Sequence, residues 1–188
     1  GLDFDNVTLV GVINADTGLF LLDFRSGERS SQWIYKAAGL SGRRSLQGEV
    51  VIQTYNADNP VIRHTARLEL KQYFNIMIGE RKELNYPPFN WIAKAEFAGI
   101  KKNIVEKTAN SIRNNFQKKL KGMEILGPAW CYRERLRGKY RMQIVFKSSK
   151  ELDPSGSKLH QFLRNNLLDK KIRSGVKINI DVDPVSLL

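Results

Sequence analysis

Two consecutive prolines, Pro87 and Pro88, constrain the fold more than any other feature of the sequence. A proline has no backbone N–H to donate, and its ring disfavours helical geometry in the residue before it. A helix that approaches residue 85 therefore cannot continue through this point. We predict two domains, residues 1–84 and residues 85–188, joined by a helix that ends near Leu84.

The segment after the prolines contains four strand-like and two helix-like patterns of apolar residues. In chain order these are a strand at 91–97, a helix at 104–120, strands at 123–132 and 140–146, a helix at 159–167 and a strand at 176–182. This order is that of an α+β, ferredoxin-like (βαββαβ) domain, in which both helices cover one face of the sheet. We expect Ser155 or Ser157 to cap the second helix.

The segment before the prolines has the pattern of an α/β domain. Val7–Ile13 is a continuous apolar run, which is typical of a strand buried on both faces of a parallel sheet. A helix is predicted at Glu28–Ala38 and a second strand at Glu49–Tyr55. Asp58, followed by Pro60, predicts the capped start of the helix that runs to the domain boundary.

The net charge of +12 is concentrated in one part of the chain. Residues 81–150 contain 17 Lys and Arg against 5 Asp and Glu, whereas residues 1–80 contain 8 against 9 and residues 151–188 contain 6 against 5. A localised positive field attracts phosphate polyanions, so nucleic acid is the expected partner. A membrane is not expected, because no basic stretch accompanies a strongly apolar helical face and no apolar run is long enough to span a bilayer.

The cysteine and histidine content argues against a metal centre formed by this chain. Cys131 is the only cysteine, and His64 and His160 are the only histidines. A cysteine-based zinc site and a paired acid–base site are therefore not expected. A single thiol without a signal peptide fits a reducing, cytoplasmic location.

The predicted strand at 140–146 carries cations on the face turned away from the core. We expect this sheet face to stay open, because both helices are predicted on the other face. Positive side chains two residues apart along an extended chain can follow a phosphate backbone. The alternative is a charged hairpin that is exposed for solubility alone. The predicted DNA-binding residues are Arg133, Arg135, Arg137, Lys139, Arg141 and Lys147.

Short motifs along nearly the whole chain, taken in order, resemble one helicase family. In the first domain they are Asn14-Ala15-Asp16, Asp23-Phe24-Arg25 and Lys36-Ala37-Ala38-Gly39-Leu40-Ser41-Gly42-Arg43. In the second they are Tyr86-Pro87-Pro88-Phe89, Ile125-Leu126-Gly127-Pro128, Arg135-Leu136-Arg137-Gly138-Lys139-Tyr140-Arg141 and Ile180-Asp181-Val182-Asp183-Pro184. Each motif is weak by itself, whereas their order is specific. The chain resembles the last part of the primosomal protein N′ (PriA) family, the superfamily 2 replication-restart helicases.

The resemblance implies that residues 1–84 are the end of the second RecA-like helicase lobe and that residues 85–188 are a C-terminal domain that helps to grip branched DNA. We expect the chain to begin within that lobe, because no element precedes its first strand. By the same resemblance, the whole protein is a 3′-to-5′ DNA helicase that uses ATP and zinc and restarts stalled forks through primosome assembly. The nucleotide-binding lobe and the zinc insertion have no counterpart here. This fragment alone is therefore expected to bind no cofactor and to be inactive.

Two segments resemble motifs of the helicase nucleotide site. Gly1-Leu2-Asp3-Phe4 resembles the fifth motif and Lys36–Arg43 the sixth. The final arginine, Arg43, matches the residue that neutralises charge on the γ-phosphate. Lys36 stands where the family has glutamine and Leu40 where it has an arginine, so one phosphate-facing cation is missing. The other candidate motif residues are Gly1, Asp3, Gly39 and Gly42.

Two other functions are compatible with these residues. One is a non-enzymatic module that binds DNA or RNA. The other, implied by the resemblance, is a docking domain for single-stranded-DNA-binding protein, with Lys158, Gln161 and Arg164 as candidates. Trp130 and Tyr132 are either core residues, as strand aromatics usually are, or stacking platforms for unpaired bases.

Overall fold

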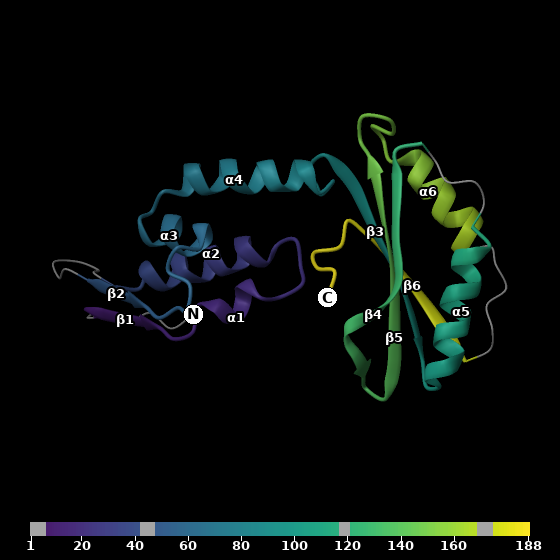
Figure 1. The fold of residues 1–188 in the computed structure, drawn as a ribbon, viewed down its shortest axis with the longest axis horizontal. Coiled ribbons are helices and arrows are strands. Elements are labelled where there is room, and N and C mark those ends of the chain that lie inside the picture. Colours follow the sequence, from purple (N-terminus) through teal and green to yellow (C-terminus); the bar gives the residue numbers. More distant parts are fainter. Residues whose placement is uncertain (1–6, 42–47, 117–120, 169–174) are drawn as a thin grey trace. The chain divides into compact units, whose positions relative to one another are not determined.

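The computed structural model describes residues 7–41, 48–116, 121–168 and 175–188. The chain divides into two compact units, Gly1–Glu80 and Arg81–Leu188. The first unit contains a parallel sheet and the second an antiparallel sheet, each accompanied by helices (Figure 1). The chain is thus a mixed α/β protein, as the sequence predicts.

The first unit is built on two short strands that pair in parallel. Its first elements are β1 (Leu9–Val12), α1 (Asp16–Leu19), α2 (Ser26–Ala38) and β2 (Glu49–Ile52). Ile34 of α2 packs with Ala15 and Ile62 in a small core. The expectation that the first strand is buried on both faces is wrong. Among the described residues its sheet has only two strands, and Leu9 is 60% exposed.

The helix predicted from Asp58 to the domain boundary is two helices. They are α3 (Pro60–Ala66) and α4 (Leu70–Glu83). Leu68, between them, has a φ of +58°, a left-handed conformation that cannot continue a helix. The predicted cap is also displaced by one residue. The side-chain oxygen of Asn59, and not that of Asp58, accepts a hydrogen bond from the Val61 backbone N–H at 2.9 Å.

Two acidic motif residues of the first unit have structural roles. The Asp16 carboxylate accepts hydrogen bonds from the Thr54 hydroxyl at 2.8 Å and from the Tyr55 backbone N–H at 2.9 Å. Asp23 accepts one from the Arg25 backbone N–H at 2.8 Å. Both aspartates are buried, and a buried carboxylate is stable only with such donors. Asp16 therefore stabilises the loop that follows β2, and Asp23 stabilises the loop between α1 and α2.

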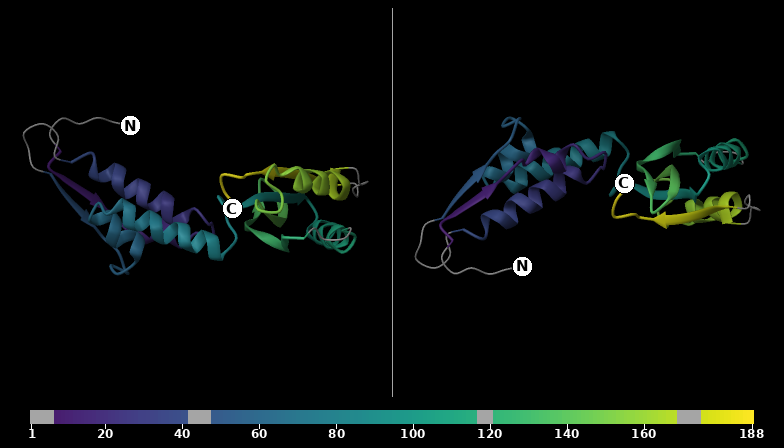
Figure 2. Two further views of the ribbon diagram at one scale, coloured as in Figure 1. Left: turned by 90° about the horizontal axis from the view of Figure 1, so that it is seen from above. Right: turned by 90° about the horizontal axis from the view of Figure 1, so that it is seen from below.

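The second unit is a four-stranded antiparallel sheet with the strand order β4-β5-β3-β6. Helices α5 and α6 lie on the same face of this sheet (Figures 1 and 2). The elements are β3 (Asn90–Gly99), α5 (Lys102–Asn114), β4 (Met123–Leu136), β5 (Lys139–Ser149), α6 (Ser157–Leu163), the π-helix η1 (Arg164–Leu168) and β6 (Val176–Val182).

The core of the second unit follows the predicted apolar alternation. Phe97 of β3, Ile144 and Phe146 of β5 and Leu159 of α6 are almost completely buried between sheet and helices. Trp130 packs against this core, as predicted, whereas Tyr132 is 57% exposed. The strand alternation and the helical spacing in this unit are therefore confirmed as predictors of the buried face.

The predicted serine cap of α6 is wrong. The residue before the helix is Gly156, whose φ of +74° places it in the left-handed region. The buried carboxylate of Asp153 instead accepts hydrogen bonds from the backbone N–H groups of Lys158 and Leu159, at 3.3 and 3.0 Å. An acid three residues upstream thus satisfies the donors that a serine was expected to satisfy.

Candidate nucleic-acid interface

Strands β4 and β5 are joined by a tight turn that carries most of the predicted DNA-binding cations. Leu136 pairs with Lys139, so the loop contains only Arg137 and Gly138. Their φ angles are +48° and +80°, the signs that a two-residue hairpin of type I′ requires. Arg137 is an unusual choice for such a position, because side chains other than those of Gly, Asn and Asp are strained there.

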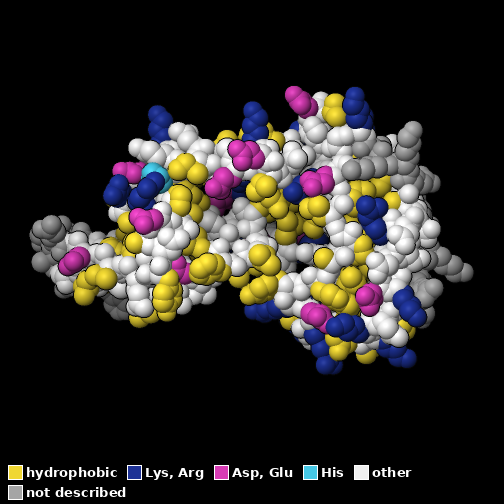
Figure 3. Space-filling model, in the orientation of Figure 1, with side chains coloured by type: hydrophobic (Ala, Val, Ile, Leu, Met, Phe, Trp, Pro, Cys, Tyr) yellow, Lys and Arg dark blue, Asp and Glu magenta, His cyan; other side chains and the backbone are white. Residues whose placement is uncertain are grey.

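Four cations at this turn are exposed, and we call them the hairpin tip: Arg133, Arg135, Arg137 and Lys139. Figure 3 shows Lys and Arg side chains gathered at the end of the second unit where the β4–β5 turn and the start of α5 lie. Among the described residues, no carboxylate forms an ion pair with any of the four. Their charge is therefore available to an external anion.

Two aromatic rings lie next to the hairpin tip and contact cations there. Trp130 and Tyr140 are in edge-to-face contact, with ring centroids 6.5 Å apart. The guanidinium of Arg135 lies 5.3 Å from the Tyr140 ring, and the ammonium of Lys102 lies 4.9 Å from the Trp130 ring. Such cation–π contacts restrict the cations without neutralising them.

Lys102, at the start of α5, joins this cluster although the sequence did not single it out as a site residue. Its ammonium forms an ion pair with Glu134, and this hydrogen bond raises the pKa of Lys102 above its ordinary value. Glu134 is the only acid between Arg133 and Lys139, and its charge is neutralised by Lys102. The contact between α5 and β4 brings together residues more than thirty positions apart, and no local periodicity reveals that proximity.

Arg141 and Lys147, which were also predicted to bind DNA, are not part of the tip. The Arg141 guanidinium forms an ion pair with Glu96 of β3, and this hydrogen bond raises the pKa of Arg141. Lys147 is 5% exposed, donates a hydrogen bond to the Leu84 carbonyl at 2.9 Å and lies 4.0 Å from the Tyr86 ring. Both cations already have acceptors within the second unit.

The face of β3 and β5 opposite the helices, which we call the sheet face, is therefore not open. Lys94 is 8% exposed and donates hydrogen bonds to the carbonyls of Ser186 and Leu188. The last residues of the chain follow β6 back across this face, and the Asp183 N–H bonds to the Ile92 carbonyl at 2.8 Å. The prediction of an open cationic row is wrong because the chain's own flanking segments cover it.

The predicted partner-binding residues Lys158, Gln161 and Arg164 are all exposed. Gln161 and Arg164 line a cavity of about 950 Å³ between α6 and β6, and Ile178 and Ile180 form part of its apolar wall. Lys158 does not line it, and its ammonium donates to the Leu152 carbonyl at 2.6 Å. The structure thus brings together two of the three residues.

Four of the five candidate residues of the nucleotide motifs lie outside the described residues, namely Gly1, Asp3, Gly42 and Arg43. Gly39 is described, and it ends α2 with an ordinary right-handed φ of −68°. Its exposed position is compatible with a loop role.

The described residues contain no group of three or more His, Cys, Asp and Glu side chains placed to hold a metal ion. None of their helices is long and apolar enough to cross a membrane.

Comparison with known proteins places these features in one family. Residues 82–185 match the model of the primosomal protein N C-terminal domain. The chain is 35% identical over its whole length to a replication restart protein PriA from Synechocystis, of which it covers 22%. It is 33% identical to that of Bacillus subtilis, covering 23% of it, and 32% identical over 99% of its length to that of Chlamydia pneumoniae, covering 24%. The chain thus spans about a quarter of the length of these relatives.

Proposed function

The chain belongs to the primosomal protein N family, and on that premise we propose that it is the C-terminal part of a replication restart protein whose second unit binds DNA. The proposed ligand is branched or single-stranded DNA at a stalled replication fork. The proposed contact is the hairpin tip, beside which Lys102 neutralises Glu134. The intact protein would act in the cytoplasm as an ATP-dependent 3′-to-5′ helicase in primosome assembly.

The arrangement of the elements supports a finer description of the fold. The order β3, α5, β4, β5, α6, β6 and the sheet order β4-β5-β3-β6 are those of a ferredoxin-like domain, which we propose for residues 85–188. In the first unit, α2 connects two parallel strands, as in a crossover unit of a RecA-like lobe. We propose that residues 1–84 are part of such a lobe.

The single observation that carries the DNA-binding proposal is the unneutralised charge of the hairpin tip. Arg133 and Arg135 are two residues apart on one strand, which separates them by about 7 Å. Arginine side chains at this spacing can each reach a phosphate of an extended strand. A solubility role alone does not account for the strained arginine at position 137 or for the acid taken up by Lys102.

Salt dependence of DNA binding tests the proposal. We expect the 188-residue chain to bind forked, single-stranded and duplex DNA, with the logarithm of the affinity falling by about 0.9 for each phosphate contact on duplex and about 0.7 on single strands as the logarithm of the salt concentration rises. Fluorescence anisotropy over a range of salt concentrations measures this slope. Absence of binding at low salt, or a slope near zero, contradicts the proposal.

The motor function is proposed for the intact protein only. ATP and zinc sites would lie in parts of the family's proteins that this chain does not contain, so the purified chain should not hydrolyse ATP. A coupled phosphate-release assay with and without forked DNA measures this. Turnover above a protein-free blank would contradict the proposal that the ATP site lies outside this chain.

The cavity between α6 and β6 supports a second candidate function, the docking of single-stranded-DNA-binding protein or another primosome protein. Its apolar wall from β6 and the Arg164 guanidinium suit a peptide with an apolar side chain and a carboxylate. Titration with a short acidic peptide that ends in phenylalanine tests this candidate. Arg164→Ala should weaken binding, whereas Lys158→Ala, outside the cavity, should not. Equal binding by both variants would reject the cavity as the site.

A further inference from the structure

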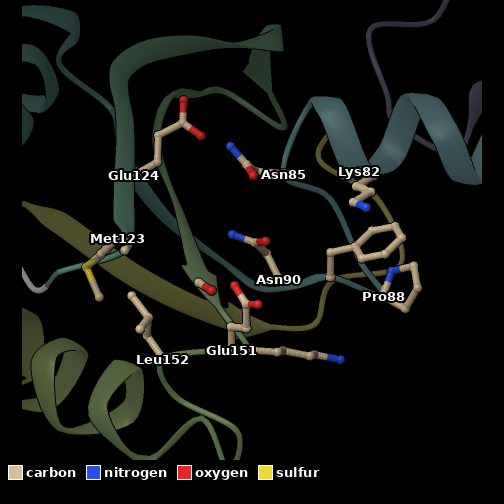
Figure 4. A pocket seen from close by; sticks show the side chains of 12 residues that line it. Lys82, Asn85, Pro88, Asn90, Met123, Glu124, Glu151 and Leu152 are labelled. Atoms are coloured by element: carbon tan, nitrogen blue, oxygen red, sulfur yellow. The ribbon is translucent and has the colours of Figure 1, made fainter.

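A second cavity lies at the opposite end of β4 and β5 from the hairpin tip, with a volume of about 840 Å³ (Figure 4). It is formed by the start of β4, the end of β5 and the segment that follows α4. Strand β5 is 11 residues long, so the two ends of the hairpin are about 35 Å apart. The principal polar residues that line the cavity are Lys82, Asn85, Asn90, Glu124, Lys150 and Glu151.

The side chain of Asn90 is the most informative feature of this cavity. Asn90 is only 7% exposed, and among the described residues its amide group has no hydrogen-bond partner. Its amide nitrogen and oxygen are not among the fully buried unpaired atoms of the described residues, so they reach the open space of the cavity. Figure 4 shows the amides of Asn90 and Asn85 pointing toward the same open space as the carboxylate of Glu124. The cavity thus presents the amide of a mostly buried side chain to an external ligand.

The charges around the cavity balance. Lys82 and Lys150 are matched by Glu124 and Glu151, so the lining favours neither an anionic nor a cationic ligand overall. The Glu124 carboxylate forms an ion pair with the ammonium of Lys147 at 3.6 Å, and its oxygens can accept further hydrogen bonds. Pro88, Phe89, Met123 and Leu152 supply apolar walls.

We propose that this cavity binds an unpaired nucleobase. A base is planar and neutral and presents donors and acceptors side by side on its edges, which matches two amides and a carboxylate between apolar walls. Guanine fits best, because its adjacent N1–H and N2–H₂ donors suit a carboxylate and its O6 and N7 acceptors suit amide N–H groups. The lysines at the cavity are then placed for the attached phosphate. This proposal deepens the proposed DNA-binding function and rests on it.

Nuclear magnetic resonance titration of the 188-residue chain with deoxyguanosine 5′-monophosphate tests the proposal without requiring polyanion binding. We expect the side-chain amide signals of Asn85 and Asn90 to shift and saturate at millimolar nucleotide. Thymidine monophosphate and inorganic phosphate should shift them far less. Deoxyinosine monophosphate, which lacks the 2-amino group, should bind about 5- to 10-fold more weakly, because it loses one donor to the carboxylate.

Substitutions inside and outside the cavity test whether the nucleotide binds there. Asn90→Ala should lower the affinity for deoxyguanosine monophosphate at least about 5-fold, because the amide contacts are lost. Asn85→Gly is a second variant that keeps the backbone, because Asn85 has a φ of +55°. Asn179→Ala, which removes an exposed amide of β6 outside the cavity, is the matched control and should change nothing.

The outcomes distinguish this proposal from the DNA-binding function. Equal shifts with deoxyguanosine monophosphate and inorganic phosphate, or equal affinity of the Asn90→Ala and Asn179→Ala variants, would overturn the base site while leaving DNA binding at the hairpin tip intact. Shifts caused by an arginine-containing peptide and not by the nucleotide would also overturn it. If the chain binds the nucleotide but no DNA, the base site stands and the hairpin-tip function fails.

Discussion

The hairpin tip and the sheet face both carry Lys and Arg side chains, but these are exposed at the tip and mostly buried on the sheet face. On the sheet face, Lys94 and Lys147 are buried and donate to backbone carbonyls, and Arg141 is paired with Glu96. At the tip, the cations are exposed and no described acid pairs with them. A buried charge must be satisfied by the fold itself, because its desolvation is otherwise too costly. Only cations that the fold leaves unsatisfied are available to a ligand.

The largest expected effect is the loss of DNA binding when the charge of the hairpin tip is reversed. The triple variant Arg133→Glu, Arg135→Glu, Arg137→Glu should lower the affinity for forked DNA on the order of 10²- to 10³-fold at low salt, because three phosphate contacts become repulsions. Anisotropy measures the affinity and urea unfolding the stability, which should stay within about 1 kcal/mol of the unaltered chain.

A matched triple variant controls for net charge. Lys71→Glu, Lys107→Glu, Lys121→Glu makes the same change in charge at exposed positions outside the tip. Its affinity should fall far less, since only the general field changes. If the two triple variants weaken DNA binding equally, the tip is not a specific contact and the comparison with the sheet face loses its functional meaning.

The second largest effect concerns stability and falls on the sheet face. Arg141→Met leaves the mostly buried Glu96 carboxylate without its partner, so the free energy of unfolding should fall by about 3 kcal/mol. DNA affinity of the folded variant at the same salt should change less than about threefold, because Arg141 does not reach a ligand. The double variant Glu96→Leu, Arg141→Met should recover part of the stability. A large loss of DNA affinity with unchanged stability would show that the sheet face binds DNA after all.

The same contrast shows what the sequence can and cannot reveal. Apolar alternation identified the core-facing residues of β3, β5 and β6, because the period of a strand depends on the sequence alone. It also placed Arg141 and Lys147 on the face opposite the core. It could not reveal that the end of the chain returns over that face, since Lys94 and the Ser186 carbonyl are brought together across 92 positions. Burial of a second face depends on tertiary contacts that no local pattern encodes.

The helical part of the first unit shows the same limit on a smaller scale. Asp58 and Pro60 correctly indicated a helix start, but the break at Leu68 has no local signal such as glycine or proline. The His64 ring lies 2.8 Å from the Glu69 carboxylate across this break. A contact between side chains thus accompanies a turn that propensity alone does not predict.

A smaller effect at the tip should have opposite signs for stability and binding. Arg137→Gly removes a side chain from a left-handed position with a φ of +48°, which should raise the free energy of unfolding by about 1 kcal/mol. It also removes one phosphate contact, so DNA affinity should fall a fewfold and the salt slope by about 0.9. Urea unfolding and anisotropy on the same sample measure both. A variant that is more stable and binds DNA equally well would mean that Arg137 is not a contact.

The smallest expected effect tests whether the sheet face is closed in solution. Burial raises the pKa of the Cys131 thiol to about 11, although Arg141 and Lys94 nearby act to lower it. Because the pKa in the folded state lies above the unfolded value, the thiol's contribution to stability is complete below about pH 8.5 and is lost as the pH rises through about 11. The difference in melting temperature between the unaltered chain and Cys131→Ala should therefore be constant from pH 6 to 8 and shrink above pH 9. If the face were open, water would relieve the burial that raises the pKa of Cys131. Rapid labelling of native Cys131 by a thiol reagent at pH 7 would then reveal the open face.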